Sequence, residues 1–421
     1  MVSGRFNFFL CWFLLGGAGF SSAVAIGYVE PATPSWGFFG HRRINRLAVF
    51  SLPMEMALFY KKNLEYITEH AVDPDKRRYA SPFEASRHFM DLDRYGSPPF
   101  AELPRSWADA CARLTDIYIR TPTADSVLLF GYEQTSLRAG RYYFCDTARQ
   151  GVAWWPADGI SAADYHRWFA TTLFLQYFEE RKEVPCDSLQ VLFEGRLPCQ
   201  TVWAVDTFSA HGILPYHLAG MEKRLQAAFA AGDAPLILRL SAEIGHYVAD
   251  AHVPLHTTAN YNGQLTGQYG IHAFWESRIP ELFADARYQY LVGAAHYVAN
   301  PAEYYWDIVL DSHRWVDRVL DTERVLRRTF PPDQQYSLER RGGTAVRTQS
   351  PGFAYAYEQA LDGLVEQRMR QAVRAVASTW YTAWTDAGQP DLSKLKIGRH
   401  SGRRDSEKRA PPGSGFGRPH E

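Results

Sequence analysis

The residues best suited to chemistry lie in one segment, which runs from His246 to Glu276 and reads HYVADAHVPLHTTANYNGQLTGQYGIHAFWE. His246 and Asp250 are four residues apart in a predicted helix, and His272 and Glu276 repeat this spacing. Such residues lie one turn apart on one helix face, so each pair can bind one metal ion or two adjacent ions. His256, just past the predicted end of the first helix, adds a fifth ligand. A single histidine is more often structural, but two pairs and a fifth ligand so close together predict a zinc site.

A second set of candidate ligands lies upstream. His41 follows Trp36 by five residues, and Asp73 precedes His88 by fifteen. Taken one at a time, each is equally well explained as a solvated loop residue or as an ordinary helix side chain. These residues therefore gain their weight from the pattern that they form with the downstream segment.

That pattern resembles the superfamily of zinc-dependent phospholipases C and fungal single-strand-specific nucleases, and especially a bacterial exported subgroup. The superfamily has three zinc ions in an all-α domain. Its ligands follow the order Trp, His, Asp, His, then H-x3-D-x5-H, then H-x3-D/E. The likeness covers residues 36 to about 392, apart from an inserted region, and H-x3-D-x5-H is matched without a gap. The matching residues are Trp36, His41, Asp73, His88, His246, Asp250, His256, His272 and Glu276.

The resemblance implies a role for each of these residues. Asp250 would bridge two of the three ions, and Asp73 is the candidate general base, provided that its second oxygen is free. Trp36 would bind through its main-chain amine and carbonyl, which requires cleavage of the chain directly before it. Paired zinc ions lower the pKa of a shared water, and a third stabilises charge on phosphoryl oxygens. The implied ligand sets are Asp73, His88, His246 and Asp250; then His256, His272 and Glu276; then Asp250, His41 and Trp36.

The implied activity is hydrolysis of phosphate esters, with two substrate classes open. The Trp-x4-His and Asp-x14-His spacings resemble the nucleases and favour single-stranded nucleic acid or nucleotides, whereas Glu276 and the short loop before His272 resemble the phospholipases C. Phe89 and Asp91 are candidates to stack on and hydrogen-bond a nucleobase, but they occur in similar form in both branches. A non-catalytic zinc-binding exported protein is the alternative outside enzymes. No stable protein partner is implied, and a monomer is expected.

The N-terminus predicts export. Arg5 supplies a basic start, Phe8 to Phe20 is apolar, and Ala23-Val24-Ala25 has the small residues of a cleavage site. The apolar run is short of the roughly 20 residues that a spanning helix needs, although a retained anchor is the other interpretation. We expect residues 1–25 to be a signal peptide, with extension to 35 as the variant that frees Trp36, and a secreted or periplasmic protein.

Four of the five cysteines would then lie in an oxidising compartment, where an even count suggests disulfides. Cys186 and Cys199 bracket a short loop and are the favoured pair. No cysteine spacing matches a zinc or redox motif, so the thiols are assigned no chemistry. The net charge of −1 gives no global field, so any attraction to phosphate must be local.

The elements that must position the ligands are predicted to be helices, and the expected class is an all-α, multi-helix domain over residues 36–392. No alternating strand series occurs. Residues 112 to about 205 differ, because they are rich in aromatic residues and break into short segments, and we expect an inserted subdomain or lid. Residues 393–421 are basic and poor in aliphatic side chains, which predicts a disordered tail. Helical patterns cover residues 41–52, 54–69, 218–231, 234–252, 303–328 and 355–385.

Overall fold

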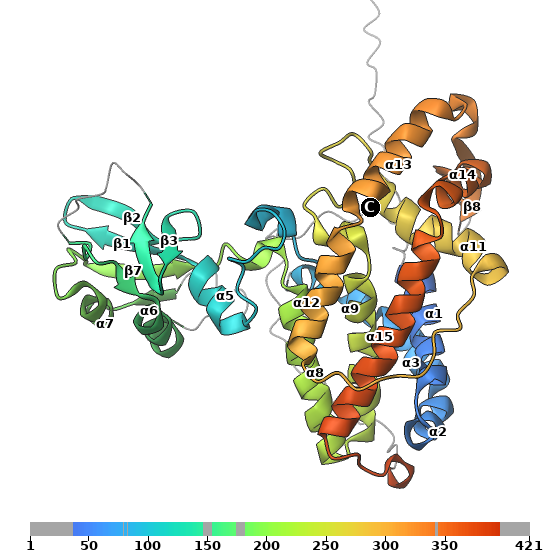
Figure 1. Ribbon diagram of the computed structural model, residues 1–421, viewed down its shortest axis with the longest axis horizontal. Helices are drawn as coiled ribbons and strands as arrows, with labels where there is room; N and C mark the ends of the chain where they lie inside the picture. The colour runs from blue at the N-terminus through green and yellow to red at the C-terminus, as the bar shows by residue number, and fades with distance from the viewer. Residues whose placement is uncertain are drawn as a thin grey trace, which may run out of the picture.

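The computed structural model describes residues 37–78, 80–81, 83–145, 154–173, 182–341 and 344–395. The predicted signal peptide over 1–25, its extension to 35, Trp36 and the predicted tail beyond Leu395 lie outside these residues. The described chain forms a helical body, residues 37–106 and 206–395, and beside it a smaller β-lobe, residues 107–205 (Figure 1).

The helical body consists of long helices joined by short helical turns. Its α-helices are α1 (Gly37–Ala48), α2 (Met54–Lys62), α3 (Leu64–Glu69), α4 (Asp73–Arg78), α8 (Leu214–Ala231), α9 (Ala234–Ala251), α10 (Ile271–Ala273), α11 (Ile279–Arg287), α12 (Pro301–His313), α13 (Val316–Thr329), α14 (Pro351–Leu361) and α15 (Leu364–Asp386). Its short turns are η1 (Val49–Ser51), η2 (His70–Val72), η3 (Ala85–His88), η4 (Leu92–Tyr95), η7 (Ser209–His211), η8 (Pro254–Thr257), η9 (Phe274–Arg278), η10 (Pro332–Gln334) and η11 (Leu392–Lys394).

Helix α9 is the central element of this body. It packs against α1, α8, α12 and α15, and most of its residues are buried. Asp233 caps its start, because the Asp233 carboxylate accepts a hydrogen bond from the Leu236 amide at 3.1 Å. On the far side, the Trp380 indole of α15 donates to the Ser241 carbonyl at 3.0 Å. A helix held on so many sides gives its side chains fixed directions, which a metal site requires.

Three of the predicted helices are each divided in two. The pattern over 54–69 is interrupted at Asn63, and that over 303–328 between α12 and α13. The pattern over 355–385 is interrupted at Asp362 and Gly363, whose φ angles of 56° and 73° are left-handed and end a helix. Each half has apolar residues at helical spacing because it packs on a hydrophobic core, so periodicity alone does not reveal the break.

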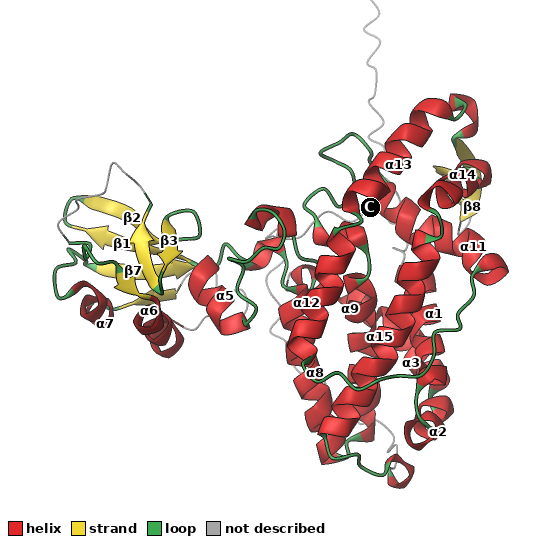
Figure 2. Cartoon of the chain, viewed as in Figure 1, coloured by secondary structure: helices red, strands yellow, loops and turns green. Residues whose placement is uncertain are grey.

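The prediction of an all-α fold is wrong for the inserted region, and the described residues are mainly helical with three small sheets (Figure 2). Within the β-lobe, one antiparallel sheet has the order β2-β1-β7-β6 and another the order β3-β4-β5. A separate hairpin, β8-β9, belongs to the helical body. The strands are β1 (Asp116–Thr121), β2 (Ala124–Phe130), β3 (Thr135–Arg138), β4 (Arg141–Phe144), β5 (Ile160–Ser161), β6 (Lys182–Val184), β7 (Thr201–Val205), β8 (Tyr336–Arg341) and β9 (Thr344–Gln349).

The β-lobe has a hydrophobic core of its own, distinct from that of the helical body. Ile117 and Ile119 alternate along β1 and are fully buried, and Phe130 stacks on Tyr165. Helices α5 (Trp107–Leu114), α6 (Ala162–Trp168) and α7 (Asp187–Gln190), with turns η5 (Phe169–Leu173) and η6 (Val191–Phe193), complete the lobe. The strands are short and their alternation spans few residues, which explains why the sequence pattern did not reveal them.

The predicted disulfide between Cys186 and Cys199 is confirmed and lies in the β-lobe, whereas Cys111 and Cys145 are free thiols. Cross-linking residues 13 positions apart restricts the unfolded lobe, which stabilises it by about 3 kcal/mol in the chain-entropy description. Replacing both cysteines with serine should therefore lower the melting temperature of the β-lobe and leave the metal content unchanged. Calorimetry with metal analysis checks this, and a loss of metal would contradict the independence of the two cores.

Among the described residues, no helix combines the length and the apolar character needed to cross a membrane. The disulfide is compatible with an extracellular location.

Candidate metal centre

Buried histidine, aspartate and glutamate side chains converge at the end of α9 in three groups, each able to hold a metal ion. In each group, one ligand atom per residue lies within 4.8 Å of the others. We name them by one member: the His41 group is His41, His246 and Asp250; the Asp75 group is Asp75, His88 and His246; the Glu276 group is His256, His272 and Glu276. His246 belongs to two groups, so these two are adjacent.

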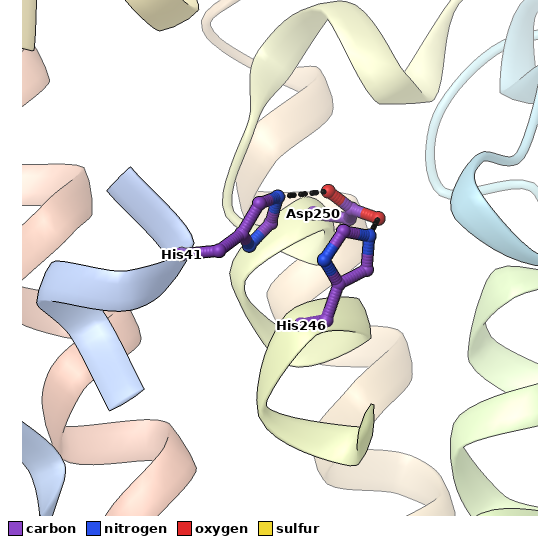
Figure 3. A group of neighbouring side chains, drawn as sticks. All are labelled: His41, His246 and Asp250. Carbon is purple, nitrogen blue, oxygen red and sulfur yellow. Dashed lines mark ion pairs between the residues drawn. The ribbon is translucent and has the colours of Figure 1, made fainter. Parts of the chain in front are cut away.

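The His41 group joins α1 to α9 (Figure 3). Asp250 Oδ1 lies 3.3 Å from His41 Nε2, and Asp250 Oδ2 lies 3.3 Å from His246 Nε2. The other contacts of Asp250 reach His88 at 2.9 Å and His256 at 3.8 Å. One carboxylate therefore touches histidines of all three groups, which is the position that a bridging ligand needs.

The close approach of α1 to α9 depends on Gly245. A Cβ atom at this position would lie 2.1 Å from Asn45 Oδ1 of α1, which is too close for any real contact. Asn45 also donates to the Ala242 carbonyl at 3.0 Å and so joins the two helices directly. As a result, the His41 and His246 rings stack with centroids 3.8 Å apart.

The Asp75 group contains Asp75 where the sequence analysis expected Asp73. Asp75 Oδ1 lies 3.9 Å from His88 Nδ1 and 3.7 Å from His246 Nε2. The Asp73 carboxylate instead pairs with His70 at 2.5 Å and with Lys76 at 2.8 Å, and its side chain is 31% exposed. Residues two apart in a helix point to different faces, and in α4 the face of Asp75 is turned to the cluster.

The Glu276 group is built by α10, the π-helical turn η9 and the turn η8. Glu276 lies in η9, which joins α10 to α11, and π-turns inside helices are frequent at functional sites. His256 Nε2 lies 3.2 Å from His272 Nε2 and 3.4 Å from Glu276 Oε2, while His272 also contacts Glu276 directly. The two predicted partners of Glu276 are thus brought together with it.

Backbone carbonyls fix the orientation of three of the histidine rings. The Nδ1 atoms of His246, His256 and His272 donate to the carbonyls of Ala71 at 2.9 Å, His88 at 2.5 Å and Tyr261 at 3.3 Å. In the neutral rings, each Nε2 lone pair then points into the cluster. Lone pairs that face each other at 3.2 Å repel unless a cation or a proton lies between them. This orientation through the second nitrogen is typical of histidines that bind metals.

The electrostatics of the metal-free cluster show how strongly it attracts positive charge. Burial alone would lower the pKa of His246, but the carboxylates of Asp250 and Asp75 raise it to about 9. Burial would raise the pKa of Asp250, yet His246 and His256 hold it well below its usual value. Glu276 behaves in the same way, because His272 and His256 outweigh burial and lower its pKa. The carboxylates therefore stay charged even though they are buried.

Behind the Asp75 group lies a buried carboxylate that the sequence analysis missed. Glu84 is fully buried, and its Oε1 lies 3.6 Å from His88 Nε2. It also accepts from Arg77 at 3.2 Å, from Arg87 at 2.9 Å and from the Tyr247 hydroxyl. Arg87 and His88 follow Glu84 by three and four residues, so this part of its surroundings is local, whereas the contact with Tyr247 depends on the fold.

The structure does not bring every predicted site residue to the cluster. Phe89 and Asp91 are only 4% and 5% exposed, so Phe89 offers no open ring face to a nucleobase. Gly212 packs directly behind Phe89, because a Cβ atom there would lie 2.1 Å from the Phe89 carbonyl oxygen. Asp73 lies outside the cluster, and Trp36 lies outside the described residues. The other predicted ligands are present: His41, His88, His246, Asp250, His256, His272 and Glu276.

Comparisons of the chain with protein-family models, with curated proteins and with solved structures give no match. The interpretation of the cluster therefore depends on its own geometry and on the order of its residues in the sequence.

Proposed function

We propose that the protein is an exported, zinc-dependent phosphodiesterase that resembles the phospholipase C and single-strand-specific nuclease superfamily. The observation that carries the proposal is the convergence of three ligand groups on Asp250 and His246. A structural polar core would not need so many titratable side chains with so few hydrogen-bond donors between them. The disulfide in the β-lobe supports export.

The donor set fits zinc. Imidazole nitrogen and carboxylate oxygen are its preferred ligands without cysteine, and two atoms about 2.0–2.1 Å from one tetrahedral zinc lie about 3.3 Å apart. The separations of 3.2 Å and 3.4 Å from His256 Nε2 and of 3.3 Å from Asp250 to His41 and to His246 agree with this value. The separations in the Asp75 group are wider, at 3.7 Å and 3.9 Å from Asp75 Oδ1, and Asp75 Oδ2 is buried without a hydrogen-bond partner among the described residues. We assign the three groups to three zinc ions, the ion of the His41 group being completed by Trp36 if that residue is the mature N-terminus.

The protein's own residues would divide the work of hydrolysis. Bound zinc would supply Lewis acidity and lower the pKa of a water molecule. Asp250 holds two ligand groups together through its two oxygens. Asp75 replaces Asp73 as the candidate base, because its Oδ1 faces the histidines while its Oδ2 has no hydrogen-bond partner and can accept a proton. Glu84 would orient the His88 ring, because its Oε1 lies 3.6 Å from His88 Nε2.

Three observations favour phospholipid over nucleic acid as the substrate. Leu265 and Tyr269 are 70% and 69% exposed on the loop that links His256 to His272, which gives the site an apolar rim. With Asp75 in the cluster, the spacing to His88 is no longer the one that resembled the nucleases. The buried ring of Phe89 also removes the stacking surface expected for a nucleobase.

The test is metal analysis combined with parallel assays on phosphatidylcholine, single-stranded DNA, RNA, 3′-mononucleotides and a soluble phosphodiester. We expect about three zinc ions per chain and turnover that chelation abolishes and zinc restores. Leu265→Ser with Tyr269→Ser should slow phospholipid hydrolysis only, and Val191→Ser, on the β-lobe, is the matched exposed control. Bound zinc without chelator-sensitive turnover on any substrate would identify a non-catalytic zinc protein and defeat the proposal.

Zinc binding should release a proton from His246. Because its pKa is raised to about 9 in the metal-free protein, this ring is protonated at neutral pH and must lose the proton to bind zinc. The apparent affinity should therefore rise about tenfold per pH unit below about pH 9 and level off above it. Calorimetric titration in buffers of different ionisation enthalpy counts the released protons. Affinity that is flat between pH 7 and 9 would contradict the assignment of His246 as a ligand.

A further inference from the structure

Helix α2 carries apolar side chains on both of its faces. Met56 and Phe59 point inward and are buried in the main core. On the outer side, Met54 and Leu58 are 68% and 58% exposed, and Phe50 of the preceding turn η1 is 59% exposed. The outer side of a surface helix is normally polar, whereas that of α2 presents Met54 and Leu58 beside the charged residues Glu55, Lys61 and Lys62.

The exposed side chains form one continuous stripe that ends in lysines. Met54, Leu58 and Lys62 are four residues apart and therefore lie along one side of α2. Lys61 Nζ lies 5.6 Å from the centroid of the Phe50 ring, which places that ring beside the last turn of the helix. Within the described ranges, neither Lys61 nor Lys62 forms an ion pair. We call Phe50, Met54, Leu58, Lys61 and Lys62 the α2 stripe.

The described part of the chain ends at the same end of the molecule. Turn η11 packs against α2, and the two lie together at the lower end of the helical body in Figure 1. The chain that continues beyond Leu395, residues 396–421, contains seven lysines and arginines but only three acidic residues. The described chain therefore ends next to α2, and the sequence that follows is basic.

We propose that the α2 stripe docks the protein on a phospholipid bilayer that carries anionic headgroups. Apolar side chains with adjacent lysines suit the boundary between acyl chains and headgroups, and a nearby basic segment adds attraction to anionic lipid. Nucleic acid would use the lysines but not three exposed apolar side chains. A second copy of the chain would bring two sets of lysines and two basic segments together, which like charges oppose.

The α2 stripe and the loop that carries Leu265 lie toward opposite ends of the helical body. The loop that carries Leu265 is tied to α13, because Gln268 donates to the Leu320 carbonyl at 2.7 Å. Figure 1 places α13 at the upper end of the helical body, opposite α2. The α2 stripe would thus tether the protein by the end opposite the loop that links His256 to His272. The inference does not depend on the proposed function.

The test measures co-sedimentation of the mature protein with vesicles of phosphatidylcholine, with and without phosphatidylglycerol. We expect binding that requires phosphatidylglycerol and weakens with salt. Met54→Ser with Leu58→Ser should lower the partition coefficient by about tenfold or more, because two exposed apolar side chains are removed. Lys61→Gln with Lys62→Gln should weaken binding and reduce its salt dependence. Leu338→Ser, 75% exposed on β8, is the matched control and should bind like the unchanged protein.

Thermal melting confirms that each variant is folded, since all the altered side chains are exposed. Absence of binding to either vesicle, or equal binding by the Met54/Leu58 variant and the unchanged protein, would overturn the proposal. A change from dimer to monomer in the Met54/Leu58 variant, measured by sedimentation, would assign the stripe to self-association. Binding to single-stranded DNA that depends on Lys61 and Lys62 but not on Met54 would assign it to nucleic acid.

Discussion

Asp250→Asn is expected to release metal and to lower phosphodiester hydrolysis by at least about 10³-fold. The Asp250 carboxylate contacts histidines of all three ligand groups, at distances from 2.9 to 3.8 Å. Asparagine keeps the size of the side chain but removes its charge and half of its acceptor capacity. One carboxylate fewer would then balance the charge of the zinc ions that the histidines bind. The ions of the His41 and Asp75 groups should therefore be lost first.

A matched control for this substitution lies on the same helix. Asp233 is exposed and caps the start of α9, and asparagine caps helices about as well as aspartate. Asp233→Asn should therefore keep the full zinc content and rate. Metal analysis and rate measurements on both variants decide the matter, and full zinc with a full rate in Asp250→Asn would show that this carboxylate is not a bridging ligand.

The second large effect is expected at Asp75. Asp75→Asn should lower the rate by at least about 10²-fold and reduce the zinc content, because this carboxylate faces both His88 and His246 from a buried position. Asp73→Asn should change the rate by no more than about twofold, as surface substitutions usually do. Asp73 is partly exposed and is engaged with His70 and Lys76 on the other side of α4.

This pair of variants is its own control, because the same exchange is made two residues apart on one short helix. Zinc content, rate and melting temperature should be measured together. Asp73→Asn should lower the melting temperature slightly, because it removes the pair with Lys76, and should leave the zinc content unchanged. The opposite pattern, with the rate lost only at Asp73, would restore the ligand assignment implied by the spacing to His88.

The sequence determined those parts of the site that depend on neighbours along the chain. His246 and Asp250 share a face of α9, and His272 contacts Glu276, because residues four apart meet in any helix, even where a π-turn follows. Asp233 was recognisable as a cap because capping also involves only adjacent residues. The disulfide between Cys186 and Cys199 was predictable for a similar reason, since a short loop keeps its two ends close.

Tertiary structure alone decided how these local pieces meet. The choice of Asp75 over Asp73 depends on which side of α4 faces α9, and a difference of two residues in spacing cannot specify a helix orientation. The contact of His41 with His246 depends on Gly245 admitting Asn45, a fit between segments about two hundred positions apart. The contact of Glu84 with His88 is again a spacing of four residues, but its contacts with Arg77 and Tyr247 depend on the packing of separate segments. Local spacing identifies candidate ligands because a helix repeats over a few residues, but the selection among them is made by packing between distant segments.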